Sequence, residues 1–355
     1  MTFLSSKLVL GAALGLLLGL GLVRLLAPRG WTDHPDARKR HPRPTALTGG
    51  LMLWGMVALG QATGWLPLGL HREEWIAVHG MALMGALDDR FGLRARYKAV
   101  AGLLVALLLG LHAAQGLLAA GGLVHVAKLD LPNRLAYTAP LAVLWFWGIP
   151  QAFNLVDGMN GLALGLAALM LSLLGYGAGT EGSFLFGAVL AALVLNYPRA
   201  RHFIGDCGAF LLGTLLAILA LKRGLPAHPN LALWIFAYPI LDVTLVVAIR
   251  LVHRRSLAEA DHNHLHDWMV ARLEGLPGVK DWARPLAAPL LLLLASGPMA
   301  HVLPWRHAHA SGAAGLALLV LVALHQFFVA LGEMRARPAG APAAPAEPPP
   351  VAPRA

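Results

Sequence analysis

The sequence has little charge and a single cysteine. Charged residues make up 13% of its 355 residues and hydrophobic residues 57%, whereas a soluble domain is roughly 25% charged. The low charge therefore excludes an ordinary soluble domain. Because Cys207 is the only cysteine, a disulfide framework and a cysteine-based metal site are excluded as well.

Long apolar runs take the place of charged segments. Runs of about 18 or more apolar residues are long enough to cross a bilayer as helices, and a helix satisfies its own backbone hydrogen bonds in lipid. We therefore predict an all-α, polytopic integral membrane protein with about eleven transmembrane helices. The expected spans are residues 5–27, 46–64, 73–87, 99–120, 137–155, 160–178, 183–197, 208–222, 231–252, 285–305 and 312–332.

The net charge of +10 gathers on one side of this predicted topology. The segments that follow odd-numbered spans share one side, and that side holds 21 of the 28 Lys and Arg residues. Positively charged loops remain in the cytoplasm, so we expect the N-terminus outside and the C-terminus in the cytoplasm. We expect the protein to lie in the lipid bilayer of the inner (plasma) membrane, and we expect its positive charge not to bind nucleic acid.

Composition divides the chain into a membrane-embedded domain, residues 1–335, and a tail, residues 336–355. The first apolar run is too long for the hydrophobic region of a signal peptide and lacks a clear cleavage site, so we interpret it as the first span. The tail is nearly all Pro and Ala. Such a composition cannot bury a core, and we expect a disordered cytoplasmic tail.

Three polar side chains interrupt the apolar runs at a spacing of three residues: Asn154, Asp157 and Asn160. On a helix, residues i and i+3 share a face, and Gly158 and Gly161 leave room beside them for a ligand. Polar groups kept inside a membrane usually mark a functional site. A polar turn between two helices explains the same residues, and the spacing does not decide between the two interpretations.

The first predicted cytoplasmic loop is basic and is followed by two glycines. Arg38 and His41 lie in this loop, and Gly49 and Gly50 open the next span. Glycines at this position allow close helix packing or the approach of a ligand to the backbone. A basic cluster that binds anionic lipid headgroups is the alternative explanation of the loop.

Two adjacent carboxylates follow the third expected span. Asp88 and Asp89 cannot both be ionised there at low cost without a cation, so they imply a metal ion, a basic partner or a proton-handling role. Basic residues follow as far as Lys98, and they suit phosphate oxygens. A solvated end of a span is the alternative.

Asp206 lies between Gly205 and Gly208, directly before an apolar helix. A carboxylate flanked by glycine is accessible to a hard cation, and the N-terminus of the new helix offers N–H groups to phosphate. A helix N-cap needs an aspartate at the same position, so the sequence does not separate the two roles.

Further polar residues lie in the C-terminal third. Asp242 follows Pro239 within an apolar run, which predicts a bent helix and an inward-facing carboxylate. His264 and His266 are spaced at i and i+2, which zinc could use. No HExxH pattern or cysteine partner accompanies them, so we favour contact with an anion.

Five segments thus return to one face of the membrane, each with a carboxylate, an amide, a histidine or a basic residue. Carboxylates together with Arg, Lys and helix N-termini indicate metal-bridged phosphate chemistry, and the adjacent apolar spans suit a lipid co-substrate. Over most of residues 28–270 the chain also resembles the polyprenyl-phosphate N-acetylhexosamine-1-phosphate transferases, the MraY/WecA-like superfamily. The resemblance is carried by RKRH and GG within residues 38–50, GALDDRFGL at 85–93, NLVDGMNGL at 154–162, GDCGAFLLG at 205–213 and, more loosely, residues 261–266.

The resemblance implies an Mg²⁺-dependent enzyme, with Mn²⁺ as an alternative metal. A UDP-N-acetylhexosamine would donate sugar-1-phosphate to undecaprenyl phosphate and release UMP, as the first membrane step of cell-surface polysaccharide synthesis. The branch it resembles most transfers N-acetylglucosamine-1-phosphate, and a homodimer remains open. The implied catalytic residues are Asp88, Asp89 and Asp206, the metal ligands Asp206 and Asn154, and the substrate-binding residues Lys98, Asp157, Asn160, Arg38, His41, His264 and His266.

Three positions depart from the family pattern. Asn160 replaces an Asp of many relatives, Ala209 the Ser of a GDxGS motif, and Asp267 the last His of an HxHH motif. The alternatives are the phospho-MurNAc-pentapeptide transferase of peptidoglycan synthesis, a non-enzymatic transporter of lipid-linked sugars, and an inactive relative. A transporter predicts polar residues spread through the bilayer, whereas here they gather at the cytoplasmic ends of spans.

Overall fold

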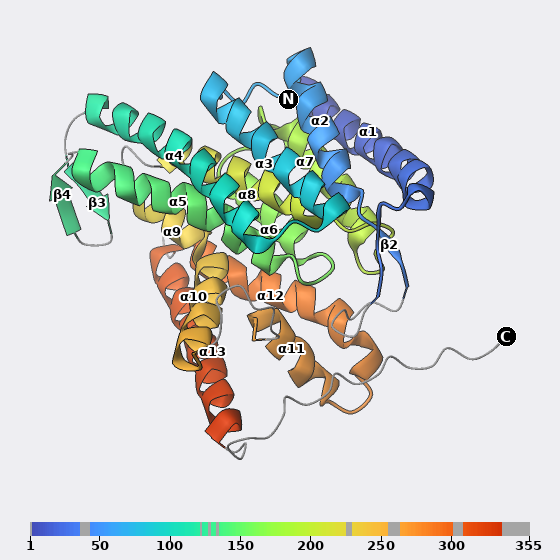
Figure 1. The fold of residues 1–355 in the computed structure, drawn as a ribbon, viewed down its shortest axis with the longest axis vertical. Helices are drawn as coiled ribbons and strands as arrows, with labels where there is room; N and C mark the ends of the chain where they lie inside the picture. The colour runs from blue at the N-terminus through green and yellow to red at the C-terminus, as the bar shows by residue number, and fades with distance from the viewer. Residues whose placement is uncertain are drawn as a thin grey trace.

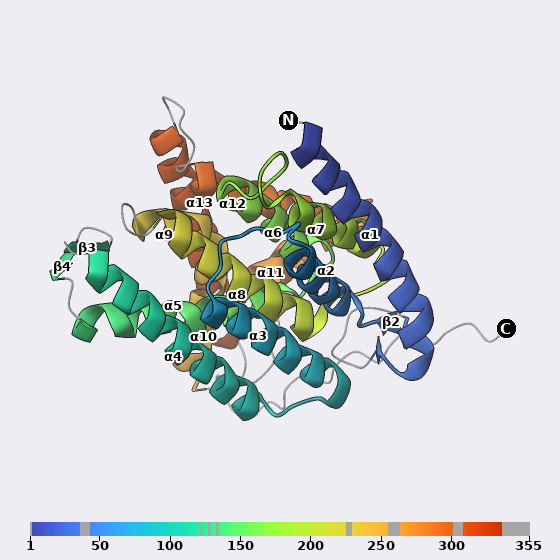
Figure 2. The ribbon, with the colours of Figure 1, turned by 90° about the horizontal axis from the view of Figure 1, so that it is seen from above.

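The computed structural model describes residues 2–35, 43–120, 123–126, 129–132, 135–224, 229–254, 263–300 and 308–335. This part of the chain is a helical bundle with two short two-stranded sheets at its edges (Figure 1, Figure 2). The helices are α1 (Thr2–Leu26), α2 (Gly49–Thr63), α3 (Arg72–Phe91), α4 (Ala95–Ala120), α5 (Leu135–Val156), α6 (Leu162–Leu173), α7 (Ser183–Asn196), α8 (Gly205–Gly224), α9 (Pro229–Ile235), α10 (Ala237–Val252), α11 (Leu265–Glu274), α12 (Ala283–Met299) and α13 (Ala308–Arg335).

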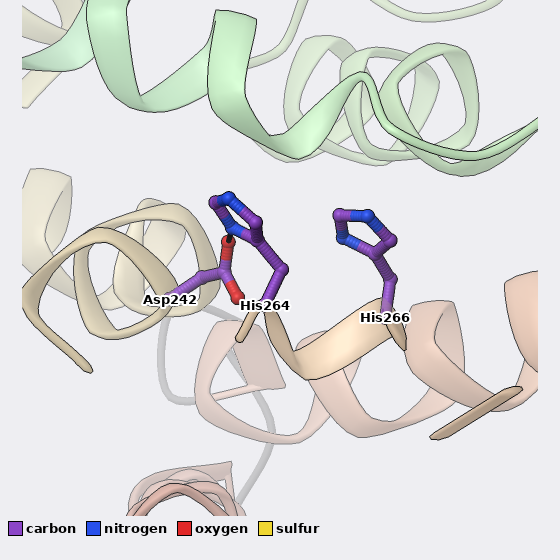
Figure 3. A group of neighbouring side chains, drawn as sticks. All are labelled: Asp242, His264 and His266. Carbon is purple, nitrogen blue, oxygen red and sulfur yellow. Dashed lines mark hydrogen bonds and ion pairs between the residues drawn. The ribbon is translucent and has the colours of Figure 1, made fainter. Parts of the chain in front are cut away.

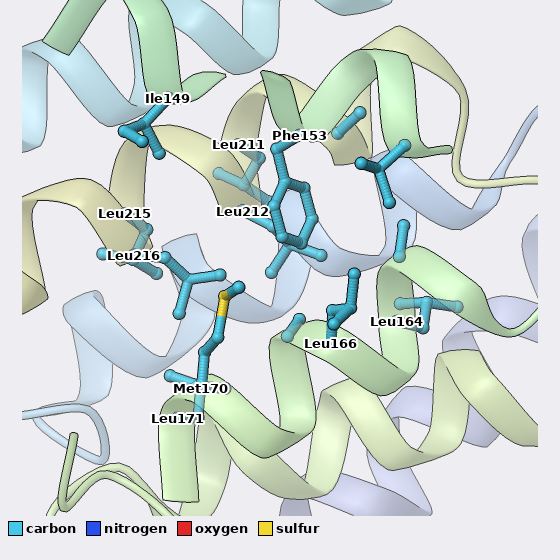
Figure 4. Packing of buried hydrophobic residues seen from close by; sticks show 14 of the residues in the cluster. Ile149, Phe153, Leu164, Leu166, Met170, Leu171, Leu211, Leu212, Leu215 and Leu216 are labelled. Carbon is cyan, nitrogen blue, oxygen red and sulfur yellow. The ribbon is translucent and has the colours of Figure 1, made fainter. Parts of the chain in front are cut away.

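Helix α8 is the centre of the bundle because it is apolar on all sides. A helix of this kind must be covered on every face, and 78% of its 18-residue apolar window is buried. Helices α5 and α6 pack along it. Figure 4 shows Phe153 of α5 and Met170 of α6 beside Leu212 and Leu216 of α8, and these four side chains are buried.

Glycines bring α2 and α3 against the first turn of α8. A Cβ on Gly50 of α2 would overlap the backbone nitrogen of Gly208, and one on Gly85 of α3 would overlap the carbonyl oxygen of Asp206. Helix association in lipid depends on such close packing rather than on the burial of apolar surface. Of the two uses expected for the glycine pair after the first loop, the structure therefore shows helix packing.

Every expected span corresponds to a described helix, but one of them is divided. Residues 231–252, predicted as a single span, form α9 and α10 with Phe236 between them. Pro239 explains the break, because it has no N–H to donate to the Ile235 carbonyl and its ring clashes with that carbonyl. At the position of the predicted bend the structure thus has a one-residue interruption, across which Phe236 still bonds Ala232 and Ile240 bonds Phe236.

Short elements also occur in segments that were predicted as loops. Strand β1 (Thr32–Asp33) pairs antiparallel with β2 (Thr45–Ala46), and β3 (Leu123–Val126) with β4 (Leu129–Pro132). Helix α11 lies within the large loop expected at residues 253–284. The description all-α is therefore correct for the bundle but leaves out these two small sheets.

Within the described part of the chain, four helices are long and apolar enough to cross a membrane. Three further apolar helices are shorter than such a crossing requires. A chain of this composition built around a helical bundle is a helical membrane protein. The four long helices cover Ser6–Arg29, Ala95–Gly116, Leu135–Val156 and Gly205–Arg223, and residues 336–355 of the expected tail lie outside the described residues.

Candidate active site

The N-terminus of α8 is capped by a carboxylate from another helix. Asp89, near the end of α3, accepts hydrogen bonds from the backbone nitrogen of Asp206 at 2.8 Å and from that of Cys207 at 3.0 Å. These N–H groups have no partner within their own helix. Gly205, with φ of 58°, leaves room for the Asp89 carboxylate, because a Cβ at this position would lie 2.5 Å from its oxygen.

Since Asp89 caps the helix, the side chain of Asp206 is available for other contacts. Its Oδ2 lies 2.9 Å from Nζ of Lys98, which lies at the same distance from Oδ2 of Asp88. The other oxygen of Asp88 accepts a hydrogen bond from the backbone nitrogen of Leu93 at 2.7 Å. One ammonium group from α4 thus joins a carboxylate of α3 to a carboxylate of α8.

The cluster contains more carboxyl groups than basic groups among the described residues, and they oppose one another's ionisation. Burial raises the pKa of Asp89, which lies beyond the expected span 73–87, to about 7, and the charge of Asp206 adds to this rise. Burial also raises the pKa of Asp157 well above its usual range, with further contributions from Asp206 and Asp89. Four carboxyl groups, those of Asp88, Asp89, Asp157 and Asp206, are thus linked by contacts or by charge, and Lys98 is paired with two of them, Asp88 and Asp206.

This donor set suits a hard divalent cation. Mg²⁺ binds carboxylate and amide oxygens, and a cation would relieve the charge repulsion that adds to the effect of burial on these pKa values. Asp206 could serve as one ligand, because its carboxylate lies at the start of α8 and shares the Lys98 ammonium with Asp88. Asn154, the second expected ligand, lies in the last turn of α5, where its carbonyl accepts a hydrogen bond from Asp157 at 3.2 Å.

The polar stretch after α5 is a turn and not a helical face. Helix α5 ends at Val156, so Asn154, Asp157 and Asn160 do not share one helix. Of the two interpretations, the structure therefore shows the turn between helices. Nδ2 of Asn160 donates to the carbonyl of Pro198 at 3.2 Å, which ties this turn to the segment before α8.

Two histidines at the start of α11, His264 and His266, lie beside this turn. His264 Nδ1 lies 2.8 Å from Oδ2 of Asp242, and the backbone nitrogen of Leu265 donates to Oδ1 of the same carboxylate at 2.7 Å. The rings of His264 and His266 are stacked, with centroids 5.2 Å apart (Figure 3). A Cβ on Gly158 would overlap the His266 ring, so the turn and the histidines are in direct contact.

Asp242, His264 and His266 are also a group that could bind a metal ion. One potential ligand atom from each lies within 4.8 Å of the others, and all three residues are buried. Two imidazoles and a carboxylate would suit a transition metal rather than Mg²⁺. The inward-facing orientation predicted for Asp242 is confirmed, because its exposed fraction is 0%.

The structure unites part of the predicted site. Asp88, Asp89, Lys98 and Asp206 form one bonded cluster, Asp157 is electrostatically linked to it, and His264 and His266 contact the turn that follows Asp157. Asn160 bonds the loop before α8 and has no described contact with the cluster. Arg38 and His41 lie outside the described residues.

Sequence reasoning missed three roles. Asp89 was not expected to cap α8, and Asp242 was not expected to hold His264. Asn196, at the end of α7, also escaped notice, although its Oδ1 accepts a hydrogen bond from the nitrogen of Gly161 at 2.6 Å. A signal existed only for Asp242, since a buried carboxylate in an apolar helix requires a partner.

The fold and the site define a class: a helical membrane protein with a carboxylate and lysine cluster at the ends of three helices. Residues 74–224 match the sequence model of the family described as glycosyl transferase family 4. This segment contains the whole bonded cluster. The family match and the curated relatives support the resemblance to the MraY/WecA-like superfamily that was drawn from the motifs.

Curated relatives extend the similarity beyond the family segment. The chain is 29% identical over 269 residues to the probable undecaprenyl-phosphate N-acetylglucosaminyl 1-phosphate transferase of Bacillus subtilis (strain 168), which covers 70% of this chain and 72% of the relative. It is 27% identical over 256 residues to the undecaprenyl-phosphate alpha-N-acetylglucosaminyl 1-phosphate transferase of Escherichia coli (strain K12), and 28% identical to that of Yersinia pestis. Each of these two matches covers 67% of this chain and 68% of the relative.

Proposed function

We propose that this protein transfers sugar-1-phosphate from a UDP-N-acetylhexosamine to undecaprenyl phosphate. A phosphate oxygen of the lipid attacks the phosphorus that carries the sugar, and the bond between this phosphorus and the bridging oxygen of UMP breaks. The products are undecaprenyl-diphospho-sugar and UMP. N-acetylglucosamine is the sugar we favour, because the similar proteins are named for it.

The observation that carries the proposal is the cluster in which Lys98 joins Asp88 to Asp206. Transfer between two phosphate-bearing substrates requires positive charge that offsets their mutual repulsion. The ammonium of Lys98 is one such charge and contacts a phosphate oxygen in the substrate complex. The excess of carboxylates beside it supports the binding of a divalent cation.

Asp206 and Asn154 would hold this cation, which we take to be Mg²⁺, with Mn²⁺ as the alternative. When bound, it neutralises phosphate charge and stabilises the UMP leaving group. The carboxylate of Asp206 is kept in place by the first turn of α8, whose N–H groups are bonded to Asp89.

Asp88 and Asp89 orient the acceptor side rather than deprotonate it. Both oxygens of each carboxylate already accept hydrogen bonds from protein donors. The second pKa of a phosphate monoester is about 6, so the acceptor is mostly dianionic at neutral pH. We therefore propose in-line attack without a general base and without a covalent intermediate.

The donor occupies the other side of the cluster in this proposal. Asp157 and Asn160 flank the nucleotide, while His264 and His266 approach the diphosphate or sugar from α11. Two residues of the first loop, Arg38 and His41, complete the substrate contacts. Basic and imidazole groups suit phosphate oxygens, which is the reason for this assignment.

The setting is the inner (plasma) membrane. We propose about eleven spans with the N-terminus outside, so that the site faces the cytoplasm, where UDP-sugars are made. Residues 1–335 form the transferase domain, and residues 336–355 a disordered tail. The reaction then initiates a cell-surface polysaccharide, and a homodimer is compatible with it.

The decisive experiment is an assay of the purified full-length protein for UMP. The protein is incubated with Mg²⁺, undecaprenyl phosphate and UDP-N-acetylglucosamine, and UMP release is measured. We expect release that depends on both substrates and stops when EDTA removes the metal. Restoration by Mg²⁺ or Mn²⁺ is expected, because both ions prefer oxygen ligands.

A panel of donors separates the proposal from its alternatives. Release of UMP from UDP-MurNAc-pentapeptide, and not from UDP-N-acetylhexosamines, would assign the protein to peptidoglycan synthesis. No release from any UDP-sugar would reject the transferase and leave a transporter or an inactive relative.

A further inference from the structure

Asp242 is a carboxylate in an unusual position, in the second turn of the apolar helix α10. Its exposed fraction is 0%, and an ionised carboxylate is costly to bury unless it is paired. Both of its oxygens are in use, one with the backbone nitrogen of Leu265 at 2.7 Å and the other with Nδ1 of His264 at 2.8 Å. Asp242 therefore joins α10 to the first residues of α11.

The two contacts determine which ring nitrogen of His264 carries a proton. A backbone N–H can only donate, and an ionised carboxylate can only accept. With Asp242 ionised and Oδ1 already accepting from Leu265, Oδ2 also accepts, so Nδ1 of His264 donates its hydrogen to Asp242. In neutral imidazole the hydrogen then belongs to Nδ1, and Nε2 carries the lone pair.

The other edge of the His264 ring faces the candidate active site. Figure 3 shows the second ring nitrogen of His264 on the side away from Asp242, toward the green segment that contains the end of α5 and the turn after it. The stacked ring of His266 contacts Gly158 in that turn. Asp157, which precedes Gly158, belongs to the carboxylate cluster through its electrostatic contacts.

We propose that Asp242 is a positioning residue, which holds His264 with Nδ1 protonated and Nε2 directed at the donor substrate. The substrate part rests on the proposed function, whereas the pairing itself does not. A carboxylate behind an imidazole fixes its tautomer and orientation, and removal of such a partner typically costs about 10–100-fold in activity in metal sites. Asp242 does not touch substrate and acts through His264.

The first test is a double-mutant cycle on kcat/KM for the UDP-sugar. We expect Asp242→Asn to lower kcat/KM about 10–100-fold. In a His264→Gln background the same substitution lowers it by less than about threefold, because the residue through which Asp242 acts is already absent. An equal loss in both backgrounds would show a purely structural role and overturn the proposal.

Tyr238→Phe is the matched control. Tyr238 lies one turn before Asp242 on the same helix, is fully buried, and its hydroxyl has no hydrogen-bond partner within the described structure. Loss of an unpaired buried hydroxyl is nearly neutral, so kcat/KM should change by less than about twofold. A loss as large as that of Asp242→Asn would mean that any change in this layer of α10 damages the site, and the proposal would fail.

The second test needs neither turnover nor a variant at Asp242. ¹⁵N spectra of histidine-labelled wild-type protein are compared with those of His264→Gln, which identifies the resonances of His264. A protonated Nδ1 supports the proposal, whereas a neutral ring with hydrogen only on Nε2 overturns it. A ring nitrogen bound to a metal that copurifies with the wild type also overturns it, since the group would then be a metal site. If UMP release fails with every donor, this measurement still decides the pairing.

Discussion

The ammonium of Lys98 holds together two carboxylates that belong to helices far apart in the sequence. At the scale of single residues, the site divides its aspartates by task. Asp89 uses both oxygens on the backbone of α8, while Asp206 turns its carboxylate toward Lys98 and Asp88. Loss of one or the other should therefore have different consequences for stability and for turnover.

Asp206→Asn should abolish turnover and leave the fold intact. A neutral amide binds Mg²⁺ more weakly than the ionised carboxylate that it replaces, and we expect at least about a hundredfold loss of UMP release. The melting temperature should stay the same or rise, because one charge is removed from a repulsive cluster. Full activity in this variant would show that the metal site lies elsewhere.

Asp89→Ala should lower both stability and turnover. Loss of a helix N-cap costs about 0.5–2 kcal/mol, and the freed first turn of α8 no longer fixes Asp206. Thermal unfolding in one detergent and UMP release report the two effects. Asp89→Asn is the control, since its single oxygen retains one of the two hydrogen bonds and should give an intermediate result. Unchanged melting in Asp89→Ala would contradict the capping role.

At the scale of helices, the site depends on how closely α3 approaches α8. Gly85 permits this approach, because any side chain there meets the backbone of Asp206. Gly80, five residues earlier on the same helix, has no atom within 4 Å of the position a Cβ would take. Substitutions at these two glycines therefore distinguish an effect on the packing of α3 against α8 from the general effect of replacing glycine in a helix.

Gly85→Ala should reduce UMP release by about a hundredfold, because a displacement of about 1 Å at a reacting centre costs that much. Gly80→Ala should keep wild-type turnover and be neutral or slightly stabilising, since alanine favours a helix by about 0.5–1 kcal/mol over glycine. Both variants are compared at equal expression in the same detergent. Equal turnover in the two would mean that α8 tolerates displacement.

The sequence predicted the helices better than their contacts. Apolar length is a property of each segment, so the helices were found, and even the break before α10 follows from Pro239 once the lost hydrogen bond to Ile235 is considered. The cap from Asp89 to α8 was not predictable in this way, because it joins residues more than one hundred positions apart. To choose between a helical face and a turn at Asp157, one likewise has to know where α5 ends.

At the scale of the whole molecule, the orientation proposed for the chain depends on charge. The short segment between α6 and α7 holds Glu181 and no Lys or Arg, whereas the segment between α3 and α4 holds Arg94, and further basic residues flank it on the two helices. Both named side chains are exposed, and the single native cysteine, Cys207, is buried. Labelling can therefore distinguish the two sides of the membrane.

Cysteines introduced one at a time at Arg94 and Glu181, in a Cys207→Ala background, should react from opposite sides. In intact cells a membrane-impermeant maleimide should label the variant at Glu181 and spare the one at Arg94 until the cells are opened. The reverse pattern would place the carboxylate cluster outside, where no UDP-sugar is available, and reject both the topology and the cytoplasmic reaction.

The unequal burial of α8 and α4 makes the bilayer a component of the site. Protein covers 78% of the apolar window of α8 but only 28% of that of α4, so α4, which carries Lys98, offers far more surface to acyl chains than α8, which carries Asp206. A mismatch between the thickness of the bilayer and the hydrophobic length of a helix is accommodated in part by tilting of the helix, at a cost of fractions of a kcal/mol per Å of mismatch. Such tilting would move the ammonium while the carboxylate stays fixed, and membrane thickness would then tune turnover.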